Sequence, residues 1–208
     1  MLPGPVEIIQ CPYCDQKFKQ STMMSGNTIG AKFWTDGKRE APMLPDSIAL
    51  TFCGACSQYF WIDDAEVIDE VEPDGYKYQD LDYLKALTLE QYIDSFQKIE
   101  IRSDQDTFFL LRQIWWKYND YFREDNEAEL SPNIKRVIPE LLDKLLDNFD
   151  ENEDEHLLLK GELLRELGSF EAAKKTLKQV TASEYLEVKE FILDLVKSEE
   201  SDLKELNI

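Results

Sequence analysis

The chain has few of the side chains that most catalytic centres use. It contains a single histidine, His156, and only four cysteines among 208 residues. His156 stands at the start of an expected helix, with no nucleophilic serine or cysteine indicated nearby, and we interpret it as a surface residue. A Cys–His or Ser–His–Asp apparatus therefore cannot be argued from this chain, and we expect a protein that is not an enzyme.

Basic residues are also scarce. Lysine and arginine total 23 against 43 aspartates and glutamates, which gives a net charge of −20. Such a surface repels phosphate backbones and anionic head groups, so nucleic acid and membranes are unlikely partners. The 43% of hydrophobic residues, with only 8 glycines and 8 prolines, indicates a folded globular chain.

Long apolar runs are missing as well. The N-terminus lacks a basic segment followed by an apolar stretch, and no window approaches the roughly 18 apolar residues that a membrane helix needs. We therefore expect a cytoplasmic protein, in a compartment that keeps thiols reduced.

The N-terminal third reads as short strands and turns. Strands are predicted over residues 6–10, 28–35, 48–52 and 59–62, and Asp36-Gly37 is a hairpin turn followed by a short return strand over 38–40. Residues 41–46 form a loop because they contain two prolines. The turn at residues 73–75 marks a domain boundary, which divides the chain into domains 1–70 and 71–208.

Beyond this boundary the apolar spacing becomes helical. We predict helices that start after Thr88, after Ser103 or Asp104, after Ser131, near residues 152–154, after Ser169 and after Ser183, with a further short helix before Thr88. The predicted fold class is α+β, a small β-rich module followed by an all-α domain.

The four cysteines form two Cys-x-x-Cys pairs, Cys11 with Cys14 and Cys53 with Cys56. Two ligands two residues apart suit one tight turn, and four thiolates suit the tetrahedral coordination of Zn²⁺. Pro12 and Gly54 favour the bends. We therefore predict one structural zinc ion held by all four cysteines, with a redox pair or unliganded thiols as the alternatives.

The paired turns resemble a zinc ribbon over about 60 residues, although residues 15–52 separate the pairs by more than the usual 15 to 20 positions. We expect this stretch to insert the hairpin at Asp36-Gly37. A closed site of four cysteines leaves no open coordination position, so its metal would fold the module and would not activate a substrate.

Residues 157–178 resemble one tetratricopeptide repeat. Gly161 and Ala173 match the small residues where the two helices of that motif cross, Gly168 matches the turn, and large residues match at Leu157, Leu164, Phe170 and Leu177. The combination of two cysteine pairs with such helices, together with residues 25–38, resembles uncharacterised bacterial proteins of that architecture. The resemblance implies a tetratricopeptide-like helical domain and names no activity.

The segment 104–123 carries two stripes at helical spacing. Phe108, Leu111, Trp115, Tyr118 and Phe122 form an apolar stripe that we expect in the core. Beside it lies a second stripe, Arg112, Trp116, Asn119 and Arg123, which could hold a carboxylate, a phosphate or an extended peptide. The alternative is that Trp116 packs internally and that the arginines pair with local acids.

The leading hypothesis is a non-enzymatic zinc-binding interaction protein whose helical domain binds a protein or peptide. A nucleic-acid- or ribosome-associated zinc ribbon factor is a second hypothesis, with a basic cluster formed by Lys17, Lys19, Lys32, Lys38 and Arg39. A thiol-redox protein that uses one Cys-x-x-Cys pair is a third.

Overall fold

The computed structural model describes residues 1–73 and 75–206, and it confirms the α+β class. The chain forms two compact units. Unit 1 comprises Met1–Ala31 and Glu40–Glu100, and unit 2 comprises Lys32–Arg39 and Ile101–Ile208. The boundary expected near residue 70 falls inside unit 1, and the segment around Asp36-Gly37 belongs to unit 2.

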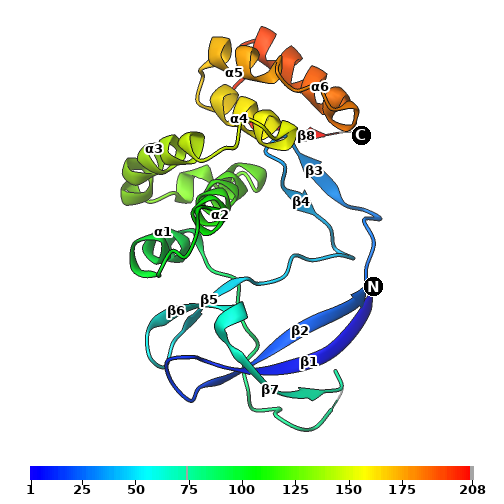
Figure 1. Cartoon of the computed structure of the whole chain (residues 1–208), viewed down its shortest axis with the longest axis vertical. Helices are drawn as coiled ribbons and strands as arrows, with labels where there is room; N and C mark the ends of the chain where they lie inside the picture. The colour runs from blue at the N-terminus through cyan, green and yellow to red at the C-terminus, as the bar shows by residue number, and fades with distance from the viewer. Residues whose placement is uncertain (74, 207–208) are drawn as a thin grey trace. The chain divides into compact units, whose positions relative to one another are not determined.

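Unit 1 is built on a three-stranded antiparallel sheet (Figure 1). Its central strand β1 (Leu2–Gln10) pairs with β2 (Lys17–Ser25) on one side and with β7 (Glu66–Val71) on the other. A separate hairpin joins β5 (Leu50–Cys53) to β6 (Gln58–Trp61), and helix α1 (Leu89–Lys98) ends the unit. Ile9, Phe60, Cys11 and Cys53 form a buried cluster between the sheet and the hairpin.

Two of these strands were not expected. β2 contains two lysines and few branched residues, and β7 carries three acidic residues among its six, so neither shows a clean alternation of apolar and polar side chains. Pairing with the apolar strand β1 on both sides overrides these weak local preferences. The helix expected before Thr88 is not found: residues 84–88 form no helix or strand.

The described part of unit 2 forms five α-helices: α2 (Asp104–Arg123), α3 (Pro132–Asp147), α4 (Asp154–Glu166), α5 (Phe170–Leu177) and α6 (Leu186–Lys197). The sequence predicted three N-caps in the chain correctly, since the side chains of Thr88, Ser103 and Ser131 each accept a bond from the backbone of the first helical turn. Pro139 lies inside α3, which runs unbroken from Pro132. A short 3₁₀ helix at Ser183–Tyr185 precedes α6.

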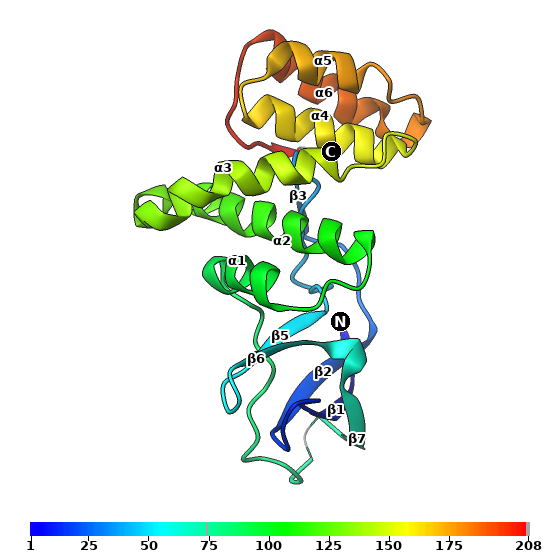
Figure 2. The ribbon, with the colours of Figure 1, turned by 60° about the vertical axis from the view of Figure 1, so that its left-hand side comes forward.

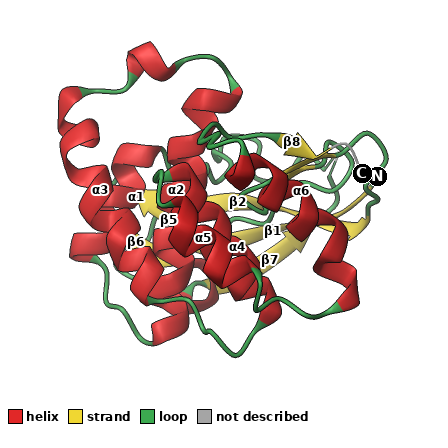
Figure 3. Cartoon of the chain, turned by 90° about the horizontal axis from the view of Figure 1, so that it is seen from above, coloured by secondary structure: helices red, strands yellow, loops and turns green. Residues whose placement is uncertain are grey.

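The helices α4 and α5 form a tight hairpin, seen side by side in Figure 3. A Cβ atom on Gly161 would lie only 2.5 Å from Cγ of Leu177, so glycine permits this close approach. Gly168 ends α4 with φ of 72°, in the left-handed region that favours glycine. Leu157, Ala173 and Leu177 are buried in the shared core. The expected small and large residues therefore meet here, while membership of the repeat family stays a prediction.

A small sheet joins distant parts of the sequence within unit 2. β3 (Lys32–Trp34) pairs with β8 (Glu205–Leu206), and β4 (Arg39–Glu40) lies on its other side. The turn at Asp36-Gly37 links β3 to β4, and its glycine has φ of 78°. The backbone N–H of Thr35 donates to the carbonyl of Lys204. Figure 2 shows β3 beneath the stack of α4, α5 and α6.

Two sequence expectations about packing need correction. In the apolar stripe of α2, Leu111 and Trp115 are buried as expected, but Phe122, in the last turn of the helix, is 38% exposed and packs edge-on against the ring of Tyr118. His156 is not a simple surface residue. Its ring stacks on Phe108 at 4.5 Å and meets the edge of Phe149.

Among residues 1–73 and 75–206, no helix combines the length and the low polarity that crossing a bilayer requires.

Candidate metal centre and the predicted partner face

Two tight turns present the four cysteines. The first follows β1, where the N–H of Cys14 donates to the carbonyl of Cys11 and the N–H of Cys11 donates to the carbonyl of Gln16. The second follows β5, where the N–H of Ser57 donates to the carbonyl of Cys53 and Ser57 adopts a left-handed φ of 59°. Each turn therefore aims both of its thiols in one direction, as the Cys-x-x-Cys spacing predicted.

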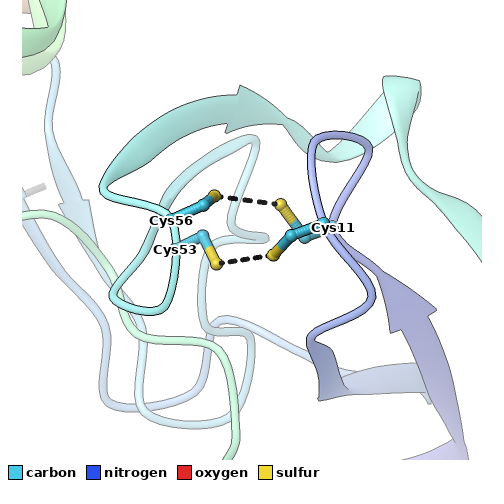
Figure 4. A group of neighbouring side chains, drawn as sticks. Cys11, Cys53 and Cys56 are labelled. Atoms are coloured by element: carbon cyan, nitrogen blue, oxygen red, sulfur yellow. Dashed lines mark hydrogen bonds between the residues drawn. The ribbon is translucent and has the colours of Figure 1, made fainter.

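The four sulfur atoms converge on one point (Figure 4). All lie within 4.8 Å of one another. The Sγ atoms of Cys11 and Cys56 are 3.8 Å apart, and those of Cys14 and Cys53 are 3.7 Å apart. With a Zn–S bond of about 2.3 Å, the edge of a regular tetrahedron is about 3.8 Å. The sulfur separations thus match the edges of a tetrahedral thiolate site and are far too long for disulfide bonds.

The surroundings also suit a metal. Cys11 and Cys53 are buried and Cys14 and Cys56 are half-buried, with Phe18, Phe60 and Ile62 packed around the group. The sulfur contacts at 3.8 and 3.7 Å join cysteines of different turns. A metal at this point would therefore link the turn after β1 to the hairpin of β5 and β6.

The surroundings shift the pKa values of the thiols in different directions. Burial raises the pKa of the Cys11 thiol to about 12. Burial also acts to raise the pKa of the Cys53 thiol, but backbone hydrogen bonds from Cys56 and Ala55 outweigh it and lower that pKa. Burial raises the pKa of Cys56. A divalent cation would offset the charge of four thiolates held together.

This arrangement can hold a metal but leaves it no open coordination position for a substrate. Four protein sulfurs complete a tetrahedral shell, and no fifth ligand belongs to the group among the described residues. Such a site stabilises a fold and does not activate water. The residues present therefore fit Zn²⁺ in a structural role.

The predicted partner face of α2 meets a carboxylate within the chain itself. Asp36, at the turn between β3 and β4, is fully buried. Its Oδ2 accepts a hydrogen bond from Nδ2 of Asn119 at 2.9 Å and pairs with the guanidinium of Arg123, and its carbonyl accepts a bond from Nε1 of Trp116 at 2.9 Å. For Trp116 and Arg123 this matches the alternative interpretation of the sequence, in which the tryptophan packs internally and the arginine pairs with a local acid.

Further contacts hold this network in place. Arg123 also donates to Asp120 and to the carbonyl of Trp116, and Lys38 pairs with Asp120. Only 2% of the Arg123 side chain is exposed. Arg112 differs, because it is half-buried and its guanidinium lies over the rings of Phe108 and Trp116, at 5.3 and 4.7 Å from their centroids.

Glu166 is the residue of this network that the sequence did not reveal. Its carboxylate accepts hydrogen bonds from Nε1 of Trp115 at 2.7 Å and from Nδ2 of Asn119. Burial, together with the negative charges of Glu162 and Asp36, raises the pKa of Glu166 well above its usual value. No sequence pattern signals this, because Glu166 lies at the end of a helix where an exposed acid would be ordinary.

The basic cluster of the second hypothesis is divided between the units. Lys17 and Lys19 lie on β2 of unit 1, whereas Lys32, Lys38 and Arg39 lie in unit 2. Lys38 pairs with Asp120 and Lys32 with Glu205. Neither unit thus gathers all five cations on one surface.

Comparison with known proteins adds no evidence on this site. Neither the protein-family models, nor the curated proteins, nor the solved structures give a match to the chain.

Proposed function

We propose that this protein is a non-enzymatic zinc-binding interaction protein. Cys11, Cys14, Cys53 and Cys56 hold one structural Zn²⁺, and the helical unit binds a protein or peptide partner. The observation that carries the proposal is the convergence of four sulfur atoms within 4.8 Å at separations that suit a tetrahedral ion.

Metal content tests the first half of the proposal. Protein purified without added metal is expected to contain one zinc per chain, and cobalt exchanged into the site should give the absorption bands of tetrahedral thiolate coordination. Replacing Cys53→Ser should release the metal. Tyr13→Ala is the matched control, because Tyr13 lies within the first turn but is 60% exposed and supplies no ligand. Full-length protein with no metal and four reactive thiols would refute the zinc site and favour the redox hypothesis.

The second half concerns the less buried end of the predicted face. Asn119 and the side chain of Arg123 are buried against Asp36, whereas Arg112 and Trp116 are half-buried, so we assign the partner role to Arg112 and Trp116. The flanking rings orient the guanidinium of Arg112, and a guanidinium held in this way suits a planar carboxylate of a partner.

A partner isolated with the full chain would be identified and titrated against three proteins. Arg112→Ala is expected to weaken its binding at least tenfold, while Arg136→Ala, a change at an exposed arginine of α3, leaves binding unchanged. Equal binding by all three proteins would refute the role of Arg112 without affecting the zinc site.

A further inference from the structure

A groove in unit 1 runs along the unpaired edge of strand β2. It has a volume of about 660 Å³ and lies between residues 19–23 of β2 and residues 45–48 of the following loop, with Met1, Pro3, Tyr83 and Leu84 completing its wall. Its lining is mostly apolar, and Lys19 and Asp46 are the charged side chains in it. The volume is within the range of sites that hold peptides and small molecules.

The edge of β2 already accepts an extended segment at one end. The N–H of Lys19 donates to the carbonyl of Asp82, and the N–H of Leu84 donates to the carbonyl of Lys19, which forms a parallel bridge with Tyr83. After Leu84 the chain leaves the edge, because the carbonyl of Lys85 accepts a bond from Thr51. The edge beyond Lys19 is therefore the part that the groove follows.

Backbone alternation shows which groups face the groove. Both backbone groups of Lys19 point away from β1, and successive residues of a strand alternate in this direction, so those of Ser21 and Met23 point the same way. On the opposite wall, Ser47 and Ile48 lie outside regular secondary structure and make no backbone hydrogen bond with any other described residue. Residues with unpaired backbone donors and acceptors thus line the space on both sides.

We propose that this groove binds an extended peptide segment of a partner protein, which adds a parallel or antiparallel strand to β2 between Ser21 and Ile48. Unpaired strand edges are the usual sites of this kind of recognition, and side chains at alternate positions give the specificity. Met1, Pro3, Met23 and Leu84 would contact the apolar side chains of the peptide, and the flexible methionines let the wall adapt to them.

Charge decides between the possible occupants. The chain carries −20, so a second copy would bring two strongly negative molecules together, and an acidic peptide would be repelled in the same way. The proposal therefore commits to a neutral or basic peptide with apolar residues at alternate positions. It concerns unit 1 alone and does not depend on Arg112.

Random heptapeptides displayed on phage and selected on the full zinc-loaded chain supply the probe. Selected sequences should be free of acidic residues, and a synthetic peptide of the consensus sequence should protect the amides of Ser21 and Met23 from hydrogen exchange. N-methylation along this peptide should weaken binding at least tenfold at every second position, because a paired strand offers alternate N–H groups to its neighbour. Weakening without this period, protection elsewhere, or no selected peptide would overturn the proposal.

Two variants complete the test. Ser21→Pro removes one outward N–H at a sheet edge, where proline is tolerated, and is expected to reduce peptide affinity at least tenfold. Ser21→Thr keeps the N–H and should bind as the unaltered chain does. Zinc content reports whether Ser21→Pro has folded. If it has not, the N-methylated peptides alone test whether the peptide pairs with β2 as a strand. A dimer that Ser21→Pro dissociates would instead identify a second copy as the occupant and refute the peptide.

Discussion

Replacing Asp36→Ala removes the carboxylate around which one side of unit 2 is packed. The side chain accepts hydrogen bonds from the N–H of Lys38 at 3.0 Å and from Nδ2 of Asn119 at 2.9 Å, and it pairs with Arg123. Asp36 is fully buried and the Arg123 side chain is 2% exposed. The substitution would therefore leave a buried guanidinium with part of its compensation lost.

Breaking a buried pair by removing one partner typically costs about 3–5 kcal/mol. We expect unit 2 of Asp36→Ala to lose this amount. With a urea dependence of about 2 kcal/mol per molar, its unfolding midpoint should fall by about 1.5–2.5 M. Tryptophan fluorescence is a suitable readout, since three of the four tryptophans, Trp34, Trp115 and Trp116, belong to unit 2. Trp61 belongs to unit 1, which zinc content reports independently.

The control is Asp143→Ala, at an exposed position of α3, which should change the unfolding free energy by no more than about 0.5 kcal/mol. Adding Arg123→Ala to Asp36→Ala should cost less than the sum of the two single changes, because it removes the orphaned charge. A loss below about 1 kcal/mol for Asp36→Ala, or strict additivity in the double variant, would refute the account of this network.

Two further predictions concern glycine packing and pH. Gly168→Ala should lower the stability by about 1 kcal/mol because the φ of Gly168 is positive. Gly161→Ala should also destabilise the chain, because the added methyl group clashes with Leu177, although alanine favours helices. A gain in thermal stability for either variant would contradict this. The pKa of Glu166 is higher in the folded chain than its usual value of 4.5. Its contribution to the stability of the fold is therefore complete below pH 4.5 and is lost as the pH rises. The stability of Glu166→Gln relative to the unaltered chain should therefore increase by up to about 1.4 kcal/mol per pH unit from 5 to 7, and a difference that does not change with pH would contradict this account.

The metal ligands could be predicted because their information is local. Two residues between cysteines fix a turn, and this spacing alone identified Cys11, Cys14, Cys53 and Cys56 as one group. Helix starts were local in the same sense, since a serine or threonine cap needs only the next three residues. These features depend on neighbouring residues and not on the rest of the chain.

Other features depended on contacts that no short window contains. The sequence indicated that Asp36-Gly37 forms a turn and that the second stripe of α2 could hold a carboxylate. It could not show that the carboxylate of Asp36 contacts this stripe. Residues 36 and 123 are brought together only by the packing of β3 against β8 and α2. The strands β2 and β7 were missed for a related reason, because their pairing with β1 supplies the apolar contacts that their own sequences lack.

The course of residues 32–39 has a consequence for dividing the chain. A fragment over the expected helical domain, residues 71–208, would lack Asp36 and the strand β3 that pairs with β8. Its Asn119 and Arg123 would lose the same contacts as in Asp36→Ala, and Gly37 would no longer cover Leu159. We therefore expect this fragment to be at least 3 kcal/mol less stable than unit 2 of the full chain, as measured by urea unfolding.

A synthetic peptide of residues 31–40, supplied in excess, should restore part of that loss through mass action, since it binds only the folded fragment. The same peptide with Asp36→Ala is the control and should restore less. If residues 71–208 unfolded at the same urea concentration as unit 2 of the full chain, the turn at Asp36 would not contribute to the stability of the helical domain. The buried ion pair could not then be the contact on which that domain depends.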